Sequence, residues 1–182
     1  MDANKEFYPL ILERRSCKQY LSDPLPIETV SAIVEAGRHA PSGMNRQMNH
    51  FYVISDSTLL GTLTQMVSEK LPAFAQRNFN YGSPVLVVVA NRFENPTALQ
   101  DVGCAMENMM LAACSLGVGS CWINQLYHLR EDSELRTLLA EKIGLSEDEW
   151  VCGSLALGLP DGPLFPGPKA HPGNPVTWIT RK

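Results

Sequence analysis

Acidic and basic residues are sparse in this chain, and no long block of like charges is present. Charged residues make up 19% of the 182 residues, and the formal net charge is -4. A protein that binds a nucleic-acid backbone needs a basic face, so the composition argues against nucleic acid as a partner. The uninterrupted apolar runs are too short to span a bilayer. The first residues, MDANKEFYPL, lack the pattern of a secretory signal, and we expect a cytoplasmic location.

The sequence also lacks a recognisable metal site or catalytic group. The five cysteines are odd in number and none has C-x-x-C spacing, which indicates reduced thiols rather than a disulfide framework. No Cys and His spacing resembles a zinc site, and no G-x-S-x-G nucleophile elbow is present. We therefore predict no metal and no catalytic side chain, so that any chemistry has to come from a bound cofactor.

Helical and strand patterns are interspersed along the chain, which predicts an α+β or α/β class with one central sheet in a single domain over residues 1–182. A tail over residues 160–182 contains six prolines and predicts an extended arm with a β-like stretch at 176–180. Ser146 and Glu149 have the spacing of a capping box and predict a helix start. The predicted helices are residues 4–15, Pro26 to Gly37, a segment from Asp56 or Ser57, 101–116 and 131–143, and the predicted strands are 50–54, 84–90, 120–124 and 149–157.

The predicted helix over residues 101–116 is apolar on nearly all sides. Its sequence, DVGCAMENMMLAACSL, places methionine, alanine, valine and leucine all round the helix axis. Such a helix must be buried on several sides. In a domain of this size, part of that burial can come from a second subunit.

A dense cationic cluster ends the first predicted helix. Arg14, Arg15, Ser16 and Lys18 combine two guanidinium groups, a hydroxyl and an ammonium within five residues. Such groups can hold a phosphate, since arginine offers paired donors and lysine a point charge. The alternative is a solvated helix end, whose cations lie near the negative pole of the helix dipole.

Two further segments offer polar groups without a complete motif. The loop at 40–47 carries Pro41, Ser42, Gly43, Asn45 and Gln47, whose hydroxyl and amide groups could bind the polar edge of a heteroaromatic ring. The same residue types are common in a plain connecting loop.

The second segment is Gly117-Val118-Gly119-Ser120-Cys121-Trp122, whose glycines would let backbone N–H groups approach a ligand. It is not the dinucleotide fingerprint G-x-G-x-x-G, and it also fits a helix end that leads into a strand. Cys121 lies in an apolar strand with no histidine nearby in sequence, which is typical of an unreactive thiol.

Taken together and in this order, these segments resemble the nitroreductase-like family of FMN-dependent oxidoreductases. The resemblance covers nearly the whole chain. It rests on RRSCKQY at 14–20, EAGRHAPSGMNRQ at 35–47, SPVLVVVA at 83–90, DVGCAMENMMLAACSLGVGSCWI at 101–123 and LALGLP at 155–160.

The resemblance implies a central mixed, mainly antiparallel sheet flanked by helices, in a homodimer with FMN at the subunit interface. The helix at 101–116 would lie in that interface, and the proline-rich arm would wrap the partner. In the implied ping-pong reaction, NADH or NADPH delivers hydride to N5 of FMN and leaves. A small organic acceptor such as a nitroaromatic or quinone then takes the electrons.

The resemblance also implies a role for individual residues. Arg14 and Ser16 match phosphate contacts with Arg15 beside them, and Lys18 matches a cation near the ribityl chain and pyrimidine edge. The 40–47 loop matches a segment that reaches the flavin from the other subunit. Gly119 and Ser120 match the loop near N5, with Cys121 adjoining it. Lys169 aligns with a second phosphate-binding cation, and His171 stands where an arginine is common.

Two other functions are compatible with the same residues. One is a protein that stores, senses or fragments flavin without steady NAD(P)H turnover. The other is an apolar dimeric scaffold without a cofactor, which the cationic cluster and the polar loop disfavour.

Overall fold

One four-stranded antiparallel sheet organises the computed structural model, which describes residues 7–75, 77–164 and 173–180. The strands are β1 (His50–Ile54), β2 (Val85–Arg92), β3 (Gly119–Ile123) and β4 (Glu149–Gly158), in the spatial order β1-β2-β4-β3. Each neighbouring pair is antiparallel. A parallel bridge between Ser16 and Ser120 adds the one mixed feature among the described pairings. The predicted α+β class, with a mixed and mainly antiparallel central sheet, is confirmed.

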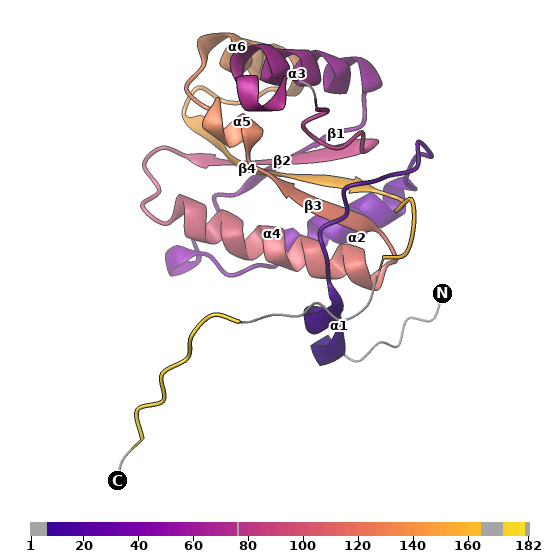
Figure 1. Cartoon of the computed structure of the whole chain (residues 1–182). Helices are drawn as coiled ribbons and strands as arrows, with labels where there is room; N and C mark the ends of the chain where they lie inside the picture. Colours follow the sequence, from indigo (N-terminus) through magenta and orange to yellow (C-terminus); the bar gives the residue numbers. More distant parts are fainter. Residues whose placement is uncertain (1–6, 76, 165–172, 181–182) are drawn as a thin grey trace.

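Helices cover both faces of this sheet (Figure 1). On one face lie α2 (Ile27–Arg38) and α4 (Ala98–Ser115), and on the other lie α3 (Ser57–Lys70), α5 (Gln125–His128) and α6 (Ser133–Ile143). Helix α1 (Phe7–Glu13) lies below α4 in this view, and two short 3-10 turns occur at η1 (Gly43–Asn45) and η2 (Pro72–Phe74). The short α5 and η2 were not predicted, because four or three residues show no helical period.

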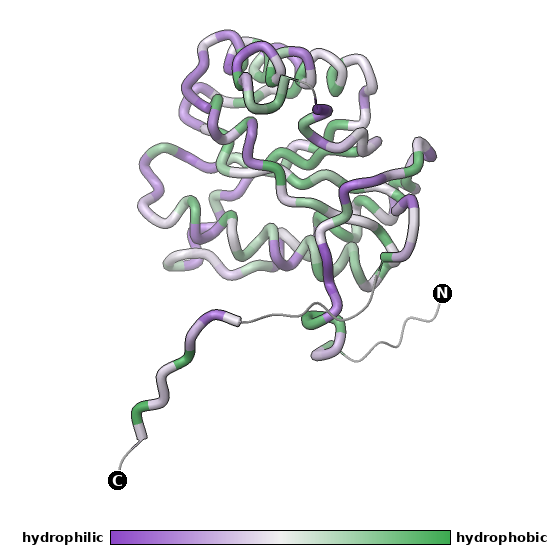
Figure 2. The backbone as a smooth tube through the Cα atoms, in the orientation of Figure 1, coloured by the Kyte–Doolittle hydropathy of each residue, from purple (hydrophilic) through white to green (hydrophobic). Residues whose placement is uncertain are grey.

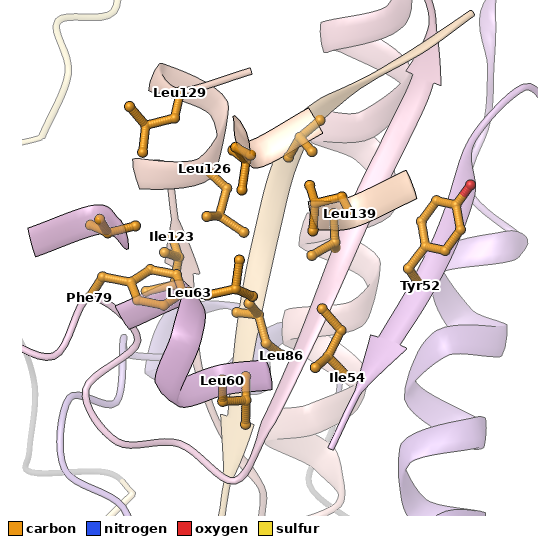
Figure 3. Close-up of a cluster of buried hydrophobic side chains, with 14 of the residues drawn as sticks. Tyr52, Ile54, Leu60, Leu63, Phe79, Leu86, Ile123, Leu126, Leu129 and Leu139 are labelled. Carbon is orange, nitrogen blue, oxygen red and sulfur yellow. The ribbon is translucent and has the colours of Figure 1, made fainter. Parts of the chain in front are cut away.

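The central strand β2 is apolar at every position from Val85 to Ala90 because both of its faces are covered. Leu86, Val88 and Ala90 belong to the core under α3 and α6, where Figure 3 shows Leu86 among leucines of both helices. Val85, Val87 and Val89 belong to the core under α2 and α4. Successive strand residues point to opposite faces, so a strand buried on both faces loses the usual alternation of polar and apolar residues.

Helices α2 and α4 approach closely at Gly37. A Cβ atom at Gly37 would lie 2.8 Å from Cγ of Met109 and 3.1 Å from the ring of Phe51. The helix continues through this residue to Arg38, so Gly37 is a point of close approach rather than a helix end. This contact fixes α4 against the sheet.

Aspartates begin two of the outer helices, and one of them, Asp56, is one of the two starts that the sequence predicts for α3. The carboxylate of Asp56 accepts hydrogen bonds from the backbone N–H groups of Thr58 and Leu59, and that of Asp132 accepts one from Leu135. Both pairs satisfy N–H groups that a helix start leaves unpaired. Gly144 ends α6 in the left-handed conformation, with a φ of 74°.

The first helix ends at Glu13, two residues before the predicted end, so Arg14, Arg15 and Lys18 lie in the segment that follows the helix. The chain leaves the helix because the next residues bond the sheet instead: Cys17 N donates to Ser120 O at 2.8 Å. Tertiary pairing of this kind overrides local helical spacing.

The predicted helix start at Ser146 and Glu149 is also wrong, because Glu149 begins β4. Its carboxylate does accept the N–H of Ser146 at 3.3 Å, as in a capping box, but it also accepts the hydroxyl of Tyr52 at 2.7 Å. These bonds connect the turn that precedes β4 to the sheet, and no helix begins there.

The C-terminal arm is described at residues 160–164 and 173–180. Residues 173–180 contain no strand, so the predicted β-like stretch at 176–180 is not observed. Figure 1 draws this part of the arm apart from the two helical layers, and Figure 2 shows hydrophobic positions along it. Val176, Trp178 and Ile179 are highly exposed there.

Candidate functional site

The cationic segment, residues 14–21, runs along the free edge of the sheet. After α1, Ser16 bridges Ser120 on the edge strand β3, and Leu21 N donates to Leu159 O just beyond β4. Asp161 N in turn donates to Gln19 O at 3.0 Å. The first part of the segment at 16–21 is therefore hydrogen-bonded to β3, and its second part is hydrogen-bonded to the residues that follow β4.

Gly119 makes this close pairing possible. A Cβ atom at Gly119 would lie 2.7 Å from Sγ and 2.9 Å from Cβ of Cys17, and 3.3 Å from the carbonyl oxygen of Gly158. Cβ contacts under 3.0 Å require something to shift. The glycine predicted to let backbone approach a ligand thus has a structural reason of its own: it admits the cationic segment to the sheet edge.

A cavity of about 310 Å³ opens between the cationic segment and the start of the C-terminal arm. Two cations, Arg15 and Lys18, and the hydroxyl of Ser16 line one wall. The backbone at 160–164, which includes Gly162 with a φ of 119°, lines the other. Two positive charges and a hydroxyl in one small cavity suit a phosphate group. The remaining lining residues are Cys17, Gln19, Pro160, Asp161, Pro163 and Leu164.

The two arginines of the cluster differ in their surroundings. Arg15 Nη1 donates to the carbonyl oxygens of Leu12 at 2.7 Å and of Arg14 at 2.8 Å, which caps the end of α1. Arg14 is not a lining residue of the cavity. Its Nε lies 3.5 Å from Oε1 of Glu107 on α4, is buried, and makes no hydrogen bond among the described residues.

Lys18 lines the cavity and lies close enough to Cys121 to influence its thiol. Lys18 Nζ is 5.7 Å from the ring centroid of Tyr81. Cys121 is 4% exposed, and burial raises the pKa of its thiol although Lys18 and the Ser16 hydroxyl act in the opposite direction. A thiol with a raised pKa is protonated at neutral pH, which supports the prediction that Cys121 is not a nucleophile.

The loop at 40–47 adopts an unusual backbone conformation. Met44, Asn45 and Gln47 all have positive φ, at 53°, 53° and 54°. Within the loop, Gln47 N donates to the hydroxyl of Ser42 at 3.0 Å, and Gln47 Nε2 donates to Oδ1 of Asn45 at 2.9 Å. Asn45 and Gln47 are exposed, so this conformation presents both amide side chains to the outside.

A buried carboxylate on α4 anchors this loop, and the sequence reasoning did not single it out. Gly43 N donates to Oδ1 of Asp101 at 2.8 Å. A Cβ at Gly43 would lie 2.4 Å from Oγ1 of Thr97, so the loop packs directly on the start of α4. Asp101 is 3% exposed, and the signal that could have revealed it is an acidic residue in a helix predicted to be buried all round.

A single chain does not bring the cationic segment and the polar loop together. In Figure 1 the loop lies near the first residues of α4, whereas α1 and the segment that follows it lie toward the other end of that helix. Two of the predicted site residues, Lys169 and His171, lie outside the described residues.

Metal and membrane sites are absent from the described part of the chain. Within residues 7–75, 77–164 and 173–180, no three His, Cys, Asp or Glu side chains are grouped closely enough to hold a metal ion. In the same ranges no helix has both the length and the apolar character to cross a membrane.

Comparisons with known proteins agree with this geometry. A family model described as the nitroreductase family matches residues 11–159. A protein of Archaeoglobus fulgidus named "Putative NADH dehydrogenase/NAD(P)H nitroreductase" is 30% identical over 159 residues, which are 86% of this chain and 86% of the relative. A solved structure of a nitroreductase with bound FMN from Bacteroides fragilis is 34% identical, with a TM-score of 0.86, and the match covers 97% of this chain and 100% of that one.

A second solved structure, a nitroreductase with bound FMN from Desulfitobacterium hafniense, shares the fold at 23% identity. Its TM-score is 0.83, with 97% of this chain and 100% of that chain covered. The family model spans well over half of the chain, and the resemblance inferred from the sequence is confirmed. The chain belongs to the nitroreductase family.

Proposed function

We propose that this protein is an FMN-dependent oxidoreductase that takes reducing equivalents from NADH or NADPH and passes them to a small organic acceptor. The cavity lined by Arg15, Ser16 and Lys18 is the observation that carries this proposal. Family membership and the names of the relatives, which include FMN and NAD(P)H, support it.

The residues present fit FMN. Its phosphate carries nearly two negative charges, and the cavity offers two cations and a hydroxyl in a chain of net charge -4. The buried Nε of Arg14 lacks a hydrogen-bond partner among the described residues, and a buried donor of this kind is costly unless a ligand or water satisfies it. We assign Arg14, Arg15, Ser16 and Lys18 to the phosphate and ribityl side of the cofactor, with Lys169 and His171 as further candidates.

The polar loop reaches the cofactor from a second copy of the chain in our proposal. Because the loop and the cationic segment lie apart in one chain (Figure 1), a homodimer interface would bring them to one ligand. Exposed apolar side chains on α1 and on the arm support such an interface: Phe7 is 68% exposed and Trp178 is 83% exposed. Pro41, Ser42, Gly43, Asn45 and Gln47 of one protomer would then meet the cations of the other.

The protein's own groups would bind and orient rather than react. FMN, when bound, supplies hydride chemistry at N5. The backbone at Gly119, Ser120 and Cys121 would lie beside the ring, and Lys18 would stabilise negative charge at its pyrimidine edge. Their task is to hold the nicotinamide or acceptor over the ring at near-attack distance, which supplies much of the rate enhancement without an acid or base from the chain.

Absorption spectroscopy tests this function directly. The purified protein should be yellow and release FMN on denaturation, and anaerobic NADH or NADPH should bleach the flavin absorption. A panel of nitroaromatic and quinone acceptors, mixed with the pre-reduced protein, would then define the acceptor class. Bound FMN that neither nucleotide bleaches would instead support storage, sensing or fragmentation of flavin. A colourless protein that takes up no FMN would contradict both functions.

A further inference from the structure

The loop at 42–47 holds a conformation that it would not adopt alone. Met44, Asn45 and Gln47 all lie in the left-handed region, which asparagine tolerates but which is unfavourable for methionine and glutamine. Its two internal hydrogen bonds, from Gln47 to Ser42 and to Asn45, are exposed, so water competes for the same donors and acceptors and the bonds stabilise the loop little. A conformation of this kind persists only where the surrounding structure imposes it.

Asp101 contacts both ends of this loop. At the first end, its Oδ1 accepts the N–H of Gly43 at 2.8 Å. At the second end, the side chain of Asn49 donates to the backbone carbonyl of Asp101 at 3.1 Å. The side chain of Asp101 therefore holds the start of the loop, and its backbone carbonyl holds Asn49 just beyond the end of the loop.

The carboxylate of Asp101 is itself held in place by neighbouring side chains. Its Oδ2 accepts Nδ2 of Asn95 at 3.0 Å and Oγ1 of Thr97 at 3.2 Å. Asn95 also donates to Oδ1 of Asn91, whose Nδ2 donates to Asn49 at 2.7 Å. Both carboxylate oxygens are thus satisfied in a buried network, and such networks fix the geometry of the groups they join.

We propose that Asp101 is a positioning residue of the flavin site, which holds the 42–47 loop in the shape that presents Asn45 and Gln47 to the cofactor bound by the partner subunit. This inference rests on the proposed FMN function. The carboxylate of Asp101 acts on the N–H of Gly43 directly and on Asn49 through Asn95 and Asn91, and it does not itself touch the cofactor.

Substitution of Asp101 tests the proposal in the whole protein. Asp101→Asn keeps the size of the side chain but replaces one of its two acceptor oxygens by an NH2 group, although three donors now point at those oxygens. We expect hydrogen exchange of the loop backbone in the apoprotein to accelerate at residues 43–47, because the bond from Gly43 weakens. We also expect FMN affinity to fall about tenfold or more, the scale of a lost hydrogen bond to a charged group.

Glu149→Gln is the matched control. Glu149 is also a buried carboxylate, 7% exposed; it accepts hydrogen bonds from Tyr52 and Ser146, and its Oε1 lies 3.0 Å from Nδ1 of His50 on β1. None of these three partners belongs to residues 42–47. The control should lower the unfolding temperature as Asp101→Asn does, yet leave FMN affinity and loop exchange at the wild-type level.

A milder variant covers the case in which Asp101→Asn does not fold. Thr97→Val keeps the shape of the side chain and removes one hydroxyl, whose proton lies within reach of either Asp101 Oδ2 or Asn95 Oδ1. It should move loop exchange and FMN affinity in the same direction by a smaller factor.

Three results separate the inference from the function on which it rests. Wild-type protein that does not bind FMN would overturn the proposed function and the inference with it. Wild-type protein that binds FMN, with Asp101→Asn or Thr97→Val binding it equally well, would overturn the inference alone. Weaker binding that matches the loss in Glu149→Gln would also overturn it, because the effect would then be general destabilisation.

Discussion

Arg14 and Glu107 face each other between the end of α1 and the middle of α4, with 3.5 Å between Nε and Oε1. The arginine side chain is 25% exposed and the glutamate side chain 47% exposed, so water weakens their attraction. The carboxylate has two effects on a phosphate ligand: it orients the guanidinium and it reduces the local positive charge.

Replacement of Glu107 by glutamine should therefore tighten FMN binding slightly. The substitution removes one negative charge near a dianionic phosphate and leaves an amide that can still orient Arg14. We expect a gain of about 0.2–1 kcal/mol, the range for exposed ion pairs, and a smaller gain at high salt. Fluorescence titration of the apoprotein with FMN at two ionic strengths measures it. Weaker binding in Glu107→Gln would show that orientation outweighs charge.

Removal of Arg14 should have the opposite and larger effect. Arg14→Ala deletes a donor that we assign to the phosphate, and the FMN affinity should fall by about 1.5–3 kcal/mol, the range for hydrogen bonds to charged groups. Arg92→Ala is a suitable control, because Arg92 lies outside the cationic cluster at 14–18 and pairs with Glu94 and Asp148. Equal affinities of the two variants in the same titration would refute the role given to Arg14.

Local patterns predicted most of the fold, and tertiary contacts explain the failures. The strand at 50–54 and the cap at Asp56 follow from residue spacing within a few positions. The end of α1 does not follow from local residue spacing, because Cys17 pairs with a strand about a hundred residues away.

The candidate site was also predicted only in part, because tertiary contacts that local patterns do not show determine the rest of it. The sequence marks Arg15, Ser16 and Lys18 as a cluster, and the structure gathers them around one cavity. Asp101 was not singled out because its importance comes from Gly43, which is distant in sequence. The left-handed residues of the loop were also not predicted, since glycine is the residue that indicates positive φ in a sequence and none of the three is glycine.

Gly119 should tolerate no side chain. The Cβ of Gly119→Ala would meet Cys17, so the cationic segment must move away from β3. We expect a loss of about 1–3 kcal/mol in the free energy of unfolding, as for an overpacked core, together with weaker FMN binding.

The double variant Gly119→Ala with Cys17→Gly tests the cause of that loss, because it removes both clashing atoms of Cys17. It should recover part of the loss. Gly61→Ala in α3 is the control: nothing lies within 4 Å of its Cβ, and alanine favours the helix, so stability should be unchanged or higher. Denaturant unfolding measures all three variants. A Gly119→Ala protein as stable as wild type would contradict the packing argument.

Acid should weaken the contribution of Asp132. The backbone N–H of Leu135 and the ammonium of Lys70 hold the pKa of Asp132 below its usual range. A carboxylate with a lower pKa in the folded state stabilises the protein fully above its unfolded pKa of about 3.9, and that contribution disappears as the pH falls through the folded value.

Asp132→Ala should therefore cost about 0.5–2 kcal/mol at pH 7, the usual range for a lost N-cap, and progressively less below pH of about 4. Asp132→Asn keeps the capping acceptor, so its smaller loss isolates the ion pair with Lys70. Urea unfolding across this pH range provides the comparison. A difference between wild type and Asp132→Ala that stays constant with pH would exclude a role for the carboxylate charge.

The arm should stabilise the dimer that we propose. Residues 173–180 expose Val176, Trp178 and Ile179 in one chain. Covering apolar side chains of this size with a second surface removes them from water and stabilises the association. A chain cut after Pro172 keeps Lys169 and His171 but loses these three residues. It should dissociate at higher concentration than the full chain in sedimentation equilibrium, and lose FMN as it does so.

Single substitutions in the full-length chain can separate the role of the arm's apolar side chains from the effect of truncation. Trp178→Ala should weaken the dimer by about 2–4 kcal/mol if the ring fills a pocket on the partner, since buried tryptophans are frequent interface hot spots. Thr177→Ala changes the adjacent residue and should leave dimerisation unaffected. A dimer of undiminished affinity in both the truncated chain and Trp178→Ala would mean that the arm does not contribute to the interface. The second copy that brings the 42–47 loop to the cations would then have to be held through α1 and α4 alone.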